Sequence, residues 1–303
     1  MIFLTPSKYK LLYVDLIMAY SKKSRIFVNS LPKSGTFLLS SAIELFGYRD
    51  YYDTAEQLGT LGCFNYREAR DALTEMGKAP LGTIDGAVSV GSQTPLYVGT
   101  DIFRKWLSVV PDEFYIAGHV SYSPSLPPIL AELDYRHVFI IRDPQAVLPS
   151  LLSFVMNTRG LPKKHYLEKD FKLMTQSQRL EIILEGGYAP EAGVEIKSFA
   201  EIYRSMLAWR NDSDSLVVRF EDLVGKKGGG RTEQQSKVLK DIAAYLRFPA
   251  HDVLSNIEKI YNPDAPTFRI GQIDSWKNSM DKKMIDRIVA YCEPLCSEAG
   301  YNC

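Results

Sequence analysis

The segment RIFVNSLPKSGTF, residues 25–37, decides the fold class of this 303-residue chain. Its first part, Arg25–Leu31, is a short apolar run that predicts a buried strand, and Leu38–Phe46 beyond it predicts a helix. Residues 32–36 form a turn between them that contains lysine, serine, glycine and threonine. A strand, a turn of this composition and a helix together predict an α/β domain that binds a phosphate group at the helix N-terminus.

The turn contains the parts that anion binding needs. Gly35 lets the backbone come close to an anion, and the N–H groups of residues 34–37 would face it at the positive end of the helix dipole. Lys33 adds a mobile positive charge. The order differs from the common phosphate loop Gly-x-x-x-x-Gly-Lys-Ser/Thr, since Lys33 precedes the glycine. Taken alone, an ordinary turn that caps a helix explains the segment about as well.

Three more apolar runs predict strands of the same sheet, at Phe114–Val120, His137–Arg142 and Ser215–Phe220. Each is almost continuously apolar, which is typical of strands covered on both faces. Helices are expected between and after them, at 101–110, Gln145–Phe154, Ala200–Arg210, Gln234–Arg247 and Lys282–Ala299. The alternation predicts a three-layer α/β/α fold with a central, mostly parallel sheet.

The remaining segments show no pattern of a second domain, so we expect residues 1–303 to form one domain. Residues 160–190 carry mixed charge without a strand pattern and predict a helical insertion, in which Gly186 ends one helix. Glycine-rich residues 50–100 show few regular patterns. KKGGGR, residues 226–231, predicts a flexible loop after the last strand.

Composition narrows the classes of function. Lys+Arg and Asp+Glu are balanced at 36 each, which disfavours a broad nucleic-acid or membrane surface. The spacing of the four cysteines, at positions 63, 292, 296 and 303, favours neither a zinc site nor a disulfide framework, so neither is expected. The apolar stretch Leu11–Tyr20 contains an aspartate and is too short to span a bilayer. We expect it to pack against the core or a partner, with peripheral membrane contact as the alternative. Without a signal-peptide pattern, a soluble cytoplasmic protein with no transmembrane segment is expected.

A second strand-to-helix turn lies within FIIRDPQAVLPSLLSF, residues 139–154. Arg142 ends the strand and Ser150 follows eight residues later, while Asp143 suits the start of the next helix. An arginine at this place can bind a phosphate with two hydrogen bonds, although a structural Arg-Asp pair is the common alternative. Two further segments, VVRFEDLVG at 217–225 and FRIGQIDSWK at 268–277, are weak signals when taken alone.

In order and spacing, these segments resemble the sulfotransferase family that uses 3′-phosphoadenosine 5′-phosphosulfate (PAPS), from about residue 25 to 280. The resemblance implies that the Lys33–Phe37 turn holds the 5′-phosphosulfate and that Arg142 and Ser150 hold the 3′-phosphate. It also implies a Phe-Glu-Asp segment at Phe220–Asp222 and a loop at Arg269–Lys277 that closes over the nucleotide. The implied nucleotide-binding residues are Lys33, Ser34, Gly35, Thr36, Phe37, Arg142, Ser150, Phe220, Arg269, Ile270 and Gly271.

The chain departs from the family pattern at three places. Phe37 replaces the second threonine of the turn, so one hydroxyl is missing. Ile270 replaces a lysine of the closing loop and cannot make that lysine's contact to the 3′-phosphate. Asp281 and Lys282 interrupt the dimer signature of many cytosolic relatives, which leaves the oligomeric state open.

Sulfuryl transfer to an alcohol needs a base that removes the hydroxyl proton, and histidine is the usual choice at neutral pH. His119 ends the predicted strand Phe114–Val120, and the strand ends are where α/β sheets present their chemistry. By itself such a histidine would more often be structural; together with the nucleotide motifs we expect it to be catalytic. His137, His165 and His251 are weaker candidates.

The resemblance also implies a mechanism without a metal, with PAPS as co-substrate and 3′-phosphoadenosine 5′-phosphate (PAP) as product. His119 takes the acceptor proton, Lys33 stabilises the oxygen between sulfur and phosphorus, and Ser150 restrains Lys33 by a hydrogen bond. We expect the acceptor, a small molecule, lipid or glycan with a hydroxyl or amine, between residues 48–125 and the insertion near 155–200. Aromatic side chains suit its wall or plain core: Tyr48, Tyr51, Tyr52, Tyr97 and Tyr122.

Two alternatives remain at this stage. A P-loop nucleotide kinase would need Gly-Lys-Ser/Thr and an acidic magnesium site, and neither lies in the right frame. A non-catalytic nucleotide-binding protein of the same fold would be expected to lack His119 or Lys33, and both are present.

Overall fold

The computed structural model describes residues 23–158, 164–249, 251–265 and 268–302. The apolar stretch Leu11–Tyr20 lies outside the described residues. The central sheet has six parallel strands in the order β10-β7-β1-β6-β2, with β3 also paired to β6. The strands are β1 Arg25–Ser30, β2 Arg49–Asp50, β3 Cys63–Phe64, β6 Phe114–Gly118, β7 Tyr135–Ile141 and β10 Ser215–Arg219.

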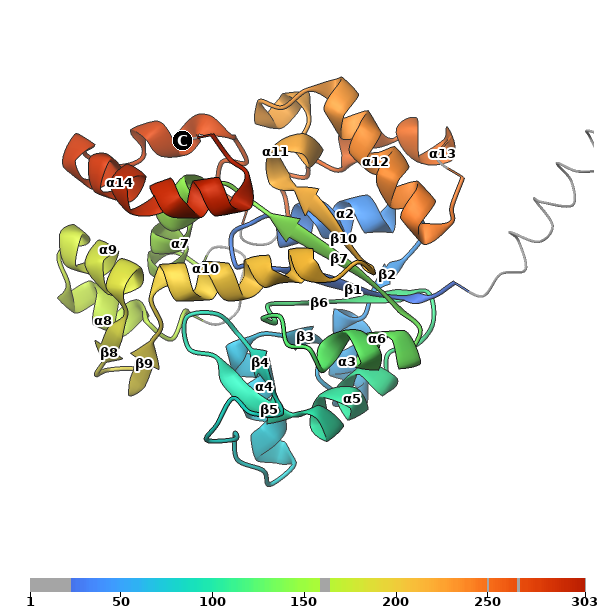
Figure 1. Ribbon diagram of the computed structural model, residues 1–303, viewed down its shortest axis with the longest axis horizontal. Helices are drawn as coiled ribbons and strands as arrows, with labels where there is room; N and C mark the ends of the chain where they lie inside the picture. Colours follow the sequence, from blue (N-terminus) through green and yellow to red (C-terminus); the bar gives the residue numbers. More distant parts are fainter. Residues whose placement is uncertain (1–22, 159–163, 250, 266–267, 303) are drawn as a thin grey trace, which may run out of the picture.

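Helices cover both faces of this sheet, so the predicted three-layer α/β/α fold is confirmed (Figure 1). Figure 1 shows α2 and α12 on one face and α5 and α6 on the other. The helices are α2 Thr36–Glu44, α3 Tyr52–Leu58, α4 Tyr66–Glu75, α5 Thr100–Ser108, α6 Leu126–Glu132, α7 Pro144–Met156, α8 Glu168–Leu173, α9 Gln176–Glu185, α10 Phe199–Leu207, α11 Phe220–Leu223, α12 Thr232–Leu246, α13 His251–Leu254 and α14 Lys282–Ala299.

Alternating side chains of the strands explain why both faces must be covered. Along β1, Ile26 and Val28 belong to the core beneath α2 and α12, whereas Phe27 belongs to the core on the other face. In β7, Val138 and Ile140 face the first core and Phe139 faces the second. Because both sets are apolar and fully buried, the strands appear in the sequence as continuous apolar runs rather than alternating ones.

The predicted strands all form, but each ends one or two residues early. Leu31, Val120, Arg142 and Phe220 lie beyond the strands to which they were assigned, and Phe220 begins α11. The predicted helix Ala200–Arg210 is α10 followed by a 3₁₀ turn at Ala208–Asn211. These shifts matter for function because they place His119 and Arg142 in the loops that follow β6 and β7.

Two antiparallel hairpins were not predicted. Strands β4 Ala87–Val90 and β5 Leu96–Gly99 form one, and β8 Gly187–Ala189 and β9 Val194–Ile196 form the other within the insertion. The helical part of the insertion is present as α8 and α9, and Gly186 ends α9 with φ 83° as expected. Strands of three or four residues give too little periodicity for a pattern to reveal.

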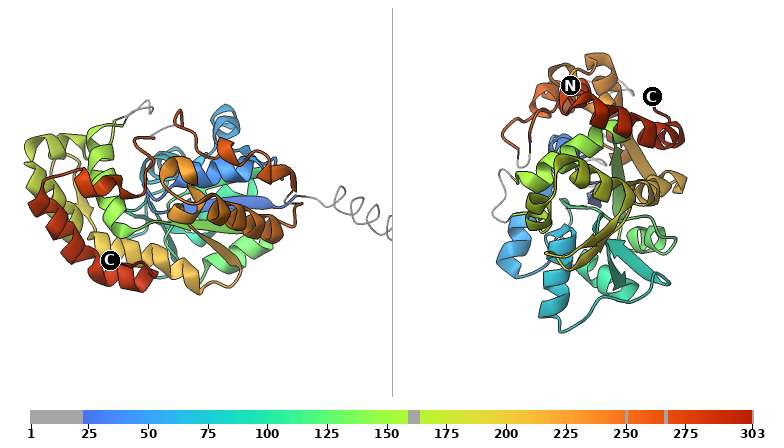
Figure 2. Two further views of the ribbon diagram at one scale, coloured as in Figure 1. Left: turned by 90° about the horizontal axis from the view of Figure 1, so that it is seen from above. Right: turned by 90° about the vertical axis from the view of Figure 1, so that its left-hand side faces the viewer.

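The insertion lies at one end of the molecule (Figure 2). Figure 2 shows α8 and α9 gathered there beside α7 and the long C-terminal α14. Helix α9 packs against both α10 and α14.

Near the C-terminus, Cys296 forms a disulfide that the sequence pattern did not predict, whereas Cys63 and Cys292 are free thiols.

No helix in the described part of the chain has the length and apolar character needed to cross a bilayer.

Candidate active site

The ends of four parallel strands meet at one edge of the sheet. The register pairs Asn29 of β1 with Gly118 of β6, and Ser30 of β1 with Ile140 of β7. Strand β10 continues the row, because Arg219 pairs with Ile141. The segments that follow β1, β6, β7 and β10 therefore emerge side by side, which brings the predicted turn, His119, Arg142 and Phe220 into one neighbourhood.

The phosphate turn has an unusual backbone. Lys33 adopts φ 71°, in the left-handed region that residues other than glycine rarely occupy, and Gly35 has φ 107°. A Cβ atom on Gly35 would lie 2.7 Å from a ring carbon of Phe220, so glycine is required by space as well as by conformation. Strained backbone of this kind is concentrated at functional sites, and here it presents the N-terminus of α2.

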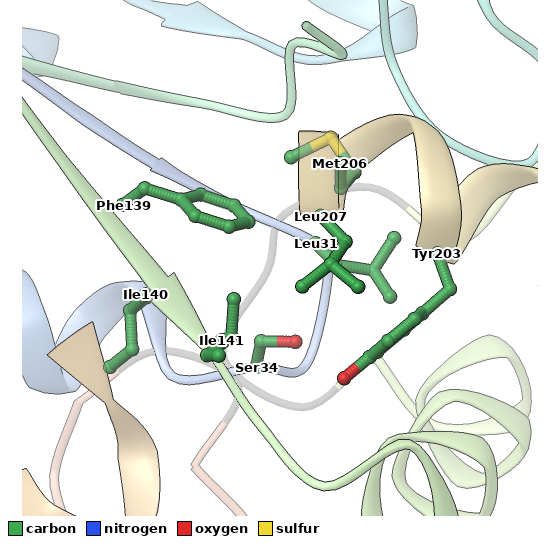
Figure 3. A pocket seen from close by; sticks show the side chains of 8 residues that line it. All are labelled: Leu31, Ser34, Phe139, Ile140, Ile141, Tyr203, Met206 and Leu207. Atoms are coloured by element: carbon green, nitrogen blue, oxygen red, sulfur yellow. The ribbon is translucent and has the colours of Figure 1, made fainter. Parts of the chain in front are cut away.

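Hydroxyl groups line the turn. Thr36 Oγ1 lies 2.6 Å from Ser30 Oγ, so this predicted ligand is hydrogen-bonded within the protein. Ser34 is buried, and its Oγ has no hydrogen-bond partner in the described part of the chain. In Figure 3 this hydroxyl points toward Leu31 and Tyr203, across a cavity of about 10 Å³. That volume is about the size of one water molecule, so this cavity is not the substrate site.

The side chain of Lys33 lies at the junction of the turn and α7. Its Nζ atom is 4.5 Å from the centre of the Phe154 ring, a cation–π contact. Burial, followed by the positive charges of Arg142 and Arg269, lowers the pKa of Lys33 to about 8. A nearby anion would favour the charged form of Lys33 and raise this pKa again.

Arg142 is buried and joins the turn to the closing loop. One Nη atom donates to the carbonyl of Lys33 at 3.1 Å and the other to the carbonyl of Gln272 at 3.4 Å. The guanidinium stacks on the ring of Phe220, 4.2 Å from its centre. Its buried Nε has no hydrogen-bond partner within the described ranges. Burial lowers the pKa of Arg142 from its ordinary value, although the residue remains a cation.

The closing loop and the turn at 226–231 hold one another. The N–H of Ile273 donates to Gly228, and the side chain of Gln272 donates to the carbonyl of Lys227. The segment predicted as a flexible loop thus contains a 3₁₀ turn, Lys226–Gly228, that supports the closing loop. Arg269 and Ile270 are exposed at the tip of that loop, next to Gly271 with φ 63°.

His119 is fixed so that one nitrogen remains able to accept a proton. Its Nδ1 lies 2.7 Å from the carbonyl oxygen of Ser30 and must donate to it. The neutral ring therefore carries its lone pair on Nε2, which is the arrangement a general base needs. Burial, and then the charge of Lys33, lower the pKa of His119 to about 4, so the ring is neutral at pH 7.

The backbone around His119 is anchored by a residue that the sequence reasoning missed. Buried Asn29 donates from its side-chain amide to the carbonyl of Val120 at 2.9 Å and accepts from the Val120 N–H at 3.0 Å. Trp209 Nε1 also donates to the Val120 carbonyl. A polar residue in the last positions of an apolar strand was the available signal, since a buried amide must find partners.

The other histidines occupy different places. His137 is the third residue of β7 and is buried against Trp209, with ring centres 4.0 Å apart. It was expected to begin the strand, which starts two residues earlier at Tyr135. His251 begins α13. His165 lies near Lys33, in a group of rings described next.

Four rings form a continuous row that starts beside Lys33, and we call Phe154, His165, Tyr166 and Tyr66 the aromatic row. Successive ring centres are 5.5, 4.5 and 4.9 Å apart. All four side chains are half-buried. Burial lowers the pKa of His165 to about 4, so it contributes a neutral ring at pH 7.

None of the five tyrosines expected along the acceptor belongs to this row. Tyr48 and Tyr51 are core residues, with 4% and 0% of their surface exposed, and Tyr52 is largely exposed. Tyr122 packs edge-on against Trp209. Tyr97 lies in β5. The plain-core interpretation is therefore correct for Tyr48 and Tyr51.

Phe220, Phe37 and Ser150 are the remaining predicted site residues. Phe220 is a buried platform between Gly35 and Arg142, and Phe37 is exposed in the first turn of α2. Ser150 lies on α7, one helical turn before Phe154. Its hydrogen bond to Lys33 stays a prediction. In the described ranges, no three His, Cys, Asp or Glu side chains are grouped as a metal site requires.

Comparison with known proteins identifies the family. The sulfotransferase domain matches residues 23–300, so the chain belongs to the sulfotransferase family. The predicted family and enzyme class, with sulfuryl transfer as the reaction, are thereby confirmed. No curated protein gives a significant match to the sequence.

Solved structures share the fold at low sequence identity. Mouse sulfotransferase SULT7A1 complexed with PAP is 19% identical with a TM-score of 0.50, over 90% of this chain and 86% of that chain. Retinol dehydratase with androsterone and the inactive cofactor PAP is 14% identical with a TM-score of 0.51, over 98% and 88%. Retinol dehydratase in a complex with retinol and PAP is also 14% identical, with a TM-score of 0.52, over 98% of this chain and 88% of that chain.

Proposed function

We propose that the chain transfers the sulfuryl group of PAPS to an acceptor hydroxyl with His119 as general base and Lys33 as the main stabiliser of the leaving group. The observation that carries this assignment is the tautomer of His119. Its Nδ1 proton is held by the Ser30 carbonyl, at the start of the same turn that carries Lys33. The two groups that the reaction needs thus belong to adjacent strand ends.

The chemistry that follows is an in-line displacement at sulfur. The acceptor oxygen forms a bond to sulfur while the bond from sulfur to the 5′-phosphate oxygen breaks. The acceptor proton passes to Nε2 of His119, and PAP leaves with the electron pair on the bridging oxygen. Lys33 and the N–H groups at the start of α2 stabilise that charge, and oriented donors of this kind are each worth roughly 3 kcal/mol. No step requires a metal ion.

For the nucleotide, we assign the 5′-phosphosulfate to Lys33–Phe37 and the 3′-phosphate to Arg142. Two features support the second assignment: Arg142 bridges the turn and the closing loop, and it has a buried Nε without a protein partner in the described ranges. Arg269 adds charge from the closing loop, since it is one cause of the lowered pKa of Lys33. We also assign Ser150 to the 3′-phosphate, together with Arg142, and Phe220 to the nucleotide site.

For the acceptor, we propose binding along the aromatic row, with its hydroxyl toward His119. The row begins at Lys33 and continues through the segment after α7 to α4. Rings stack on flat apolar groups, so a ring-bearing acceptor suits it better than a short alcohol. Retinol and androsterone, bound by the retinol dehydratase structures, are acceptor-sized molecules of this kind. We further propose one domain over 1–303, with the insertion near 155–200 serving the acceptor.

Thermal melting with different nucleotides tests the donor. PAP should raise the melting temperature, whereas ATP at the same concentration should not, because ATP lacks a 3′-phosphate. Stabilisation by ATP with magnesium alone would favour the kinase interpretation. A screen for PAPS-dependent sulfation of phenols, alcohols, lipids and glycans then tests turnover. Strong PAP binding without any turnover would favour a non-catalytic nucleotide-binding protein.

A further inference from the structure

One peptide group, between Arg142 and Asp143, is held by a side chain at each of its ends. Its carbonyl oxygen accepts a hydrogen bond of 2.9 Å from the hydroxyl of Tyr203, on α10. Its N–H donates to Oε1 of Glu221, on α11, at 3.1 Å. Figure 1 shows α10 and α11 near the end of β7, where this peptide group lies. The peptide group that follows Arg142 is therefore held from both faces of the sheet.

Glu221 is itself held by the C-terminal end of the chain. The hydroxyl of Tyr301 donates to its second oxygen, Oε2, at 2.9 Å. Tyr301 lies just beyond α14, and its N–H donates to the carbonyl of Cys296. The guanidinium of Arg219 stacks on the Tyr301 ring, 4.7 Å from its centre, and donates to the carbonyl of Gly300 at 2.8 Å. The position of Tyr301 is thus set by α14 and β10 together.

We propose that Tyr301, acting through Glu221, is a positioning residue that holds Arg142 in the geometry needed to bind the 3′-phosphate. The inference rests on the proposed function, in which Arg142 binds that phosphate. It gives Tyr301 an indirect role in nucleotide binding, through Glu221 and Arg142.

The contacts between Tyr301 and Arg142 depend on the carboxylate of Glu221. Glu221 is largely removed from water, and burial raises its pKa above the ordinary range. A buried carboxylate keeps its charge and orientation only while donors satisfy its oxygens. Without the Tyr301 hydroxyl, Oε2 loses its donor and the carboxylate can turn away from the Asp143 N–H. The peptide group after Arg142 is then held only at its carbonyl, by Tyr203, so the position of Arg142 is less tightly fixed.

The test compares two nucleotides that differ by the 3′-phosphate. Tyr301→Phe keeps the ring on Arg219 and removes only the hydroxyl. We expect the variant to bind PAP about three- to tenfold more weakly, with adenosine 5′-phosphate binding unchanged, because a displaced arginine loses part of a charge-assisted contact. Arg142→Ala sets the upper limit and should lose about tenfold to a hundredfold for PAP alone.

Tyr245→Phe is the matched control, because Tyr245 contacts the N-terminal half of β7, the strand that leads to Arg142. Its hydroxyl donates to the carbonyl of Asp214 at 2.6 Å and accepts from the His137 N–H at 3.1 Å. It should lower the melting temperature at least as much as Tyr301→Phe and leave the ratio of PAP to adenosine 5′-phosphate affinity unchanged. A merely structural role for Tyr301 would give the same result as this control.

The outcomes separate the two levels of the argument. If Arg142→Ala lowers the affinity ratio and Tyr301→Phe does not, the positioning role is wrong and the nucleotide assignment stands. If Arg142→Ala weakens both nucleotides equally, the 3′-phosphate assignment fails and the positioning role fails with it. If Tyr301→Phe does not fold, Glu221→Gln provides the same comparison, since it removes the carboxylate charge at nearly constant shape and should also lower the ratio.

Discussion

The proposed nucleotide side and the proposed acceptor side of this site are built on different principles. The nucleotide side consists of three cations on loops, Lys33, Arg142 and Arg269. Arg142 joins these loops, because it donates to the carbonyls of Lys33 and Gln272. The acceptor side is the aromatic row, four half-buried rings that touch mainly through their faces and edges. The two sides meet where the Lys33 ammonium lies on the Phe154 ring.

This difference separates a fixed recognition task from an adaptable one. Charge and hydrogen bonds require particular atoms at particular distances, so the nucleotide side tolerates little change. Rings bind by area and shape, so the acceptor side can change its specificity without disturbing the donor. Substitutions on one side should therefore leave binding on the other nearly intact, apart from those at the Lys33–Phe154 contact.

The largest expected effect is that of Lys33→Ala. At saturating PAPS the rate should fall by about 10²–10³-fold, since a charged donor to the leaving group is removed. Single-turnover rates with PAPS and 4-nitrophenol measure it. The matched control is Lys237→Ala on the exposed face of α12, which should keep the wild-type rate. A near-normal rate for Lys33→Ala would remove this residue from the mechanism.

His119→Ala should come next, with a rate about 100-fold or more below wild type and PAP affinity nearly unchanged. In the wild type, kcat/KM should rise with pH through the titration of His119, because only the neutral ring accepts a proton. Its pKa of about 4 in the free protein places this limb on the acid side. The variant should lack the limb.

A structural role for His119 would be detected in the same experiment. Loss of the hydrogen bond to Ser30 would then lower the melting temperature and weaken PAP binding together with the rate. Intact activity in His119→Ala would contradict the catalytic assignment directly.

Tyr166→Ala tests the acceptor side and should have a smaller effect. We expect the KM for 4-nitrophenol to rise about tenfold with the Kd for PAP unchanged, since one stacking ring is removed. Arg269→Ala should do the opposite, by weakening PAP and leaving the acceptor KM unchanged. If Tyr166→Ala weakens PAP as much as it weakens the acceptor, the two sides are not independent.

The two sides also differ in how far the sequence could predict them. The residues proposed to bind the nucleotide lie in continuous segments at strand ends, so short motifs such as PKSGT at 32–36 and RDP at 142–144 could single them out. Parallel register then brought these segments together without further information. The aromatic row comes from α4, α7 and the segment before α8, and no local pattern connects Tyr66 with Phe154.

Contacts that depend on packing were equally hidden. Nothing in FEDL at 220–223 indicates that its glutamate accepts from both a strand-end N–H and a tyrosine 80 residues later. Likewise, Asn29 was passed over as part of an apolar strand, although its amide fixes the loop of His119. Such residues are set by tertiary neighbours rather than by spacing along the chain.

The smallest expected signal is a proton taken up when the nucleotide binds. Lys33 has a pKa of about 8 in the free protein, lowered by burial and by Arg142 and Arg269, so at pH 9 it is mostly neutral. Phosphate groups beside it would stabilise the charged form and raise the pKa toward the ordinary lysine value of about 10.4. At pH 9 PAP binding should therefore take up close to one proton, whereas below pH 7 this lysine should contribute almost none. His119 is neutral at pH 9 with or without PAP, and the arginines stay charged, so the signal belongs to Lys33.

Titration calorimetry in two buffers of different ionisation enthalpy measures the uptake. Lys33→Arg is the matched control, since arginine keeps the charge and has no proton to gain. Equal binding heats in both buffers for wild type would mean that the bound anion does not lie against Lys33, and the nucleotide side would lose the cation that connects it to the aromatic row.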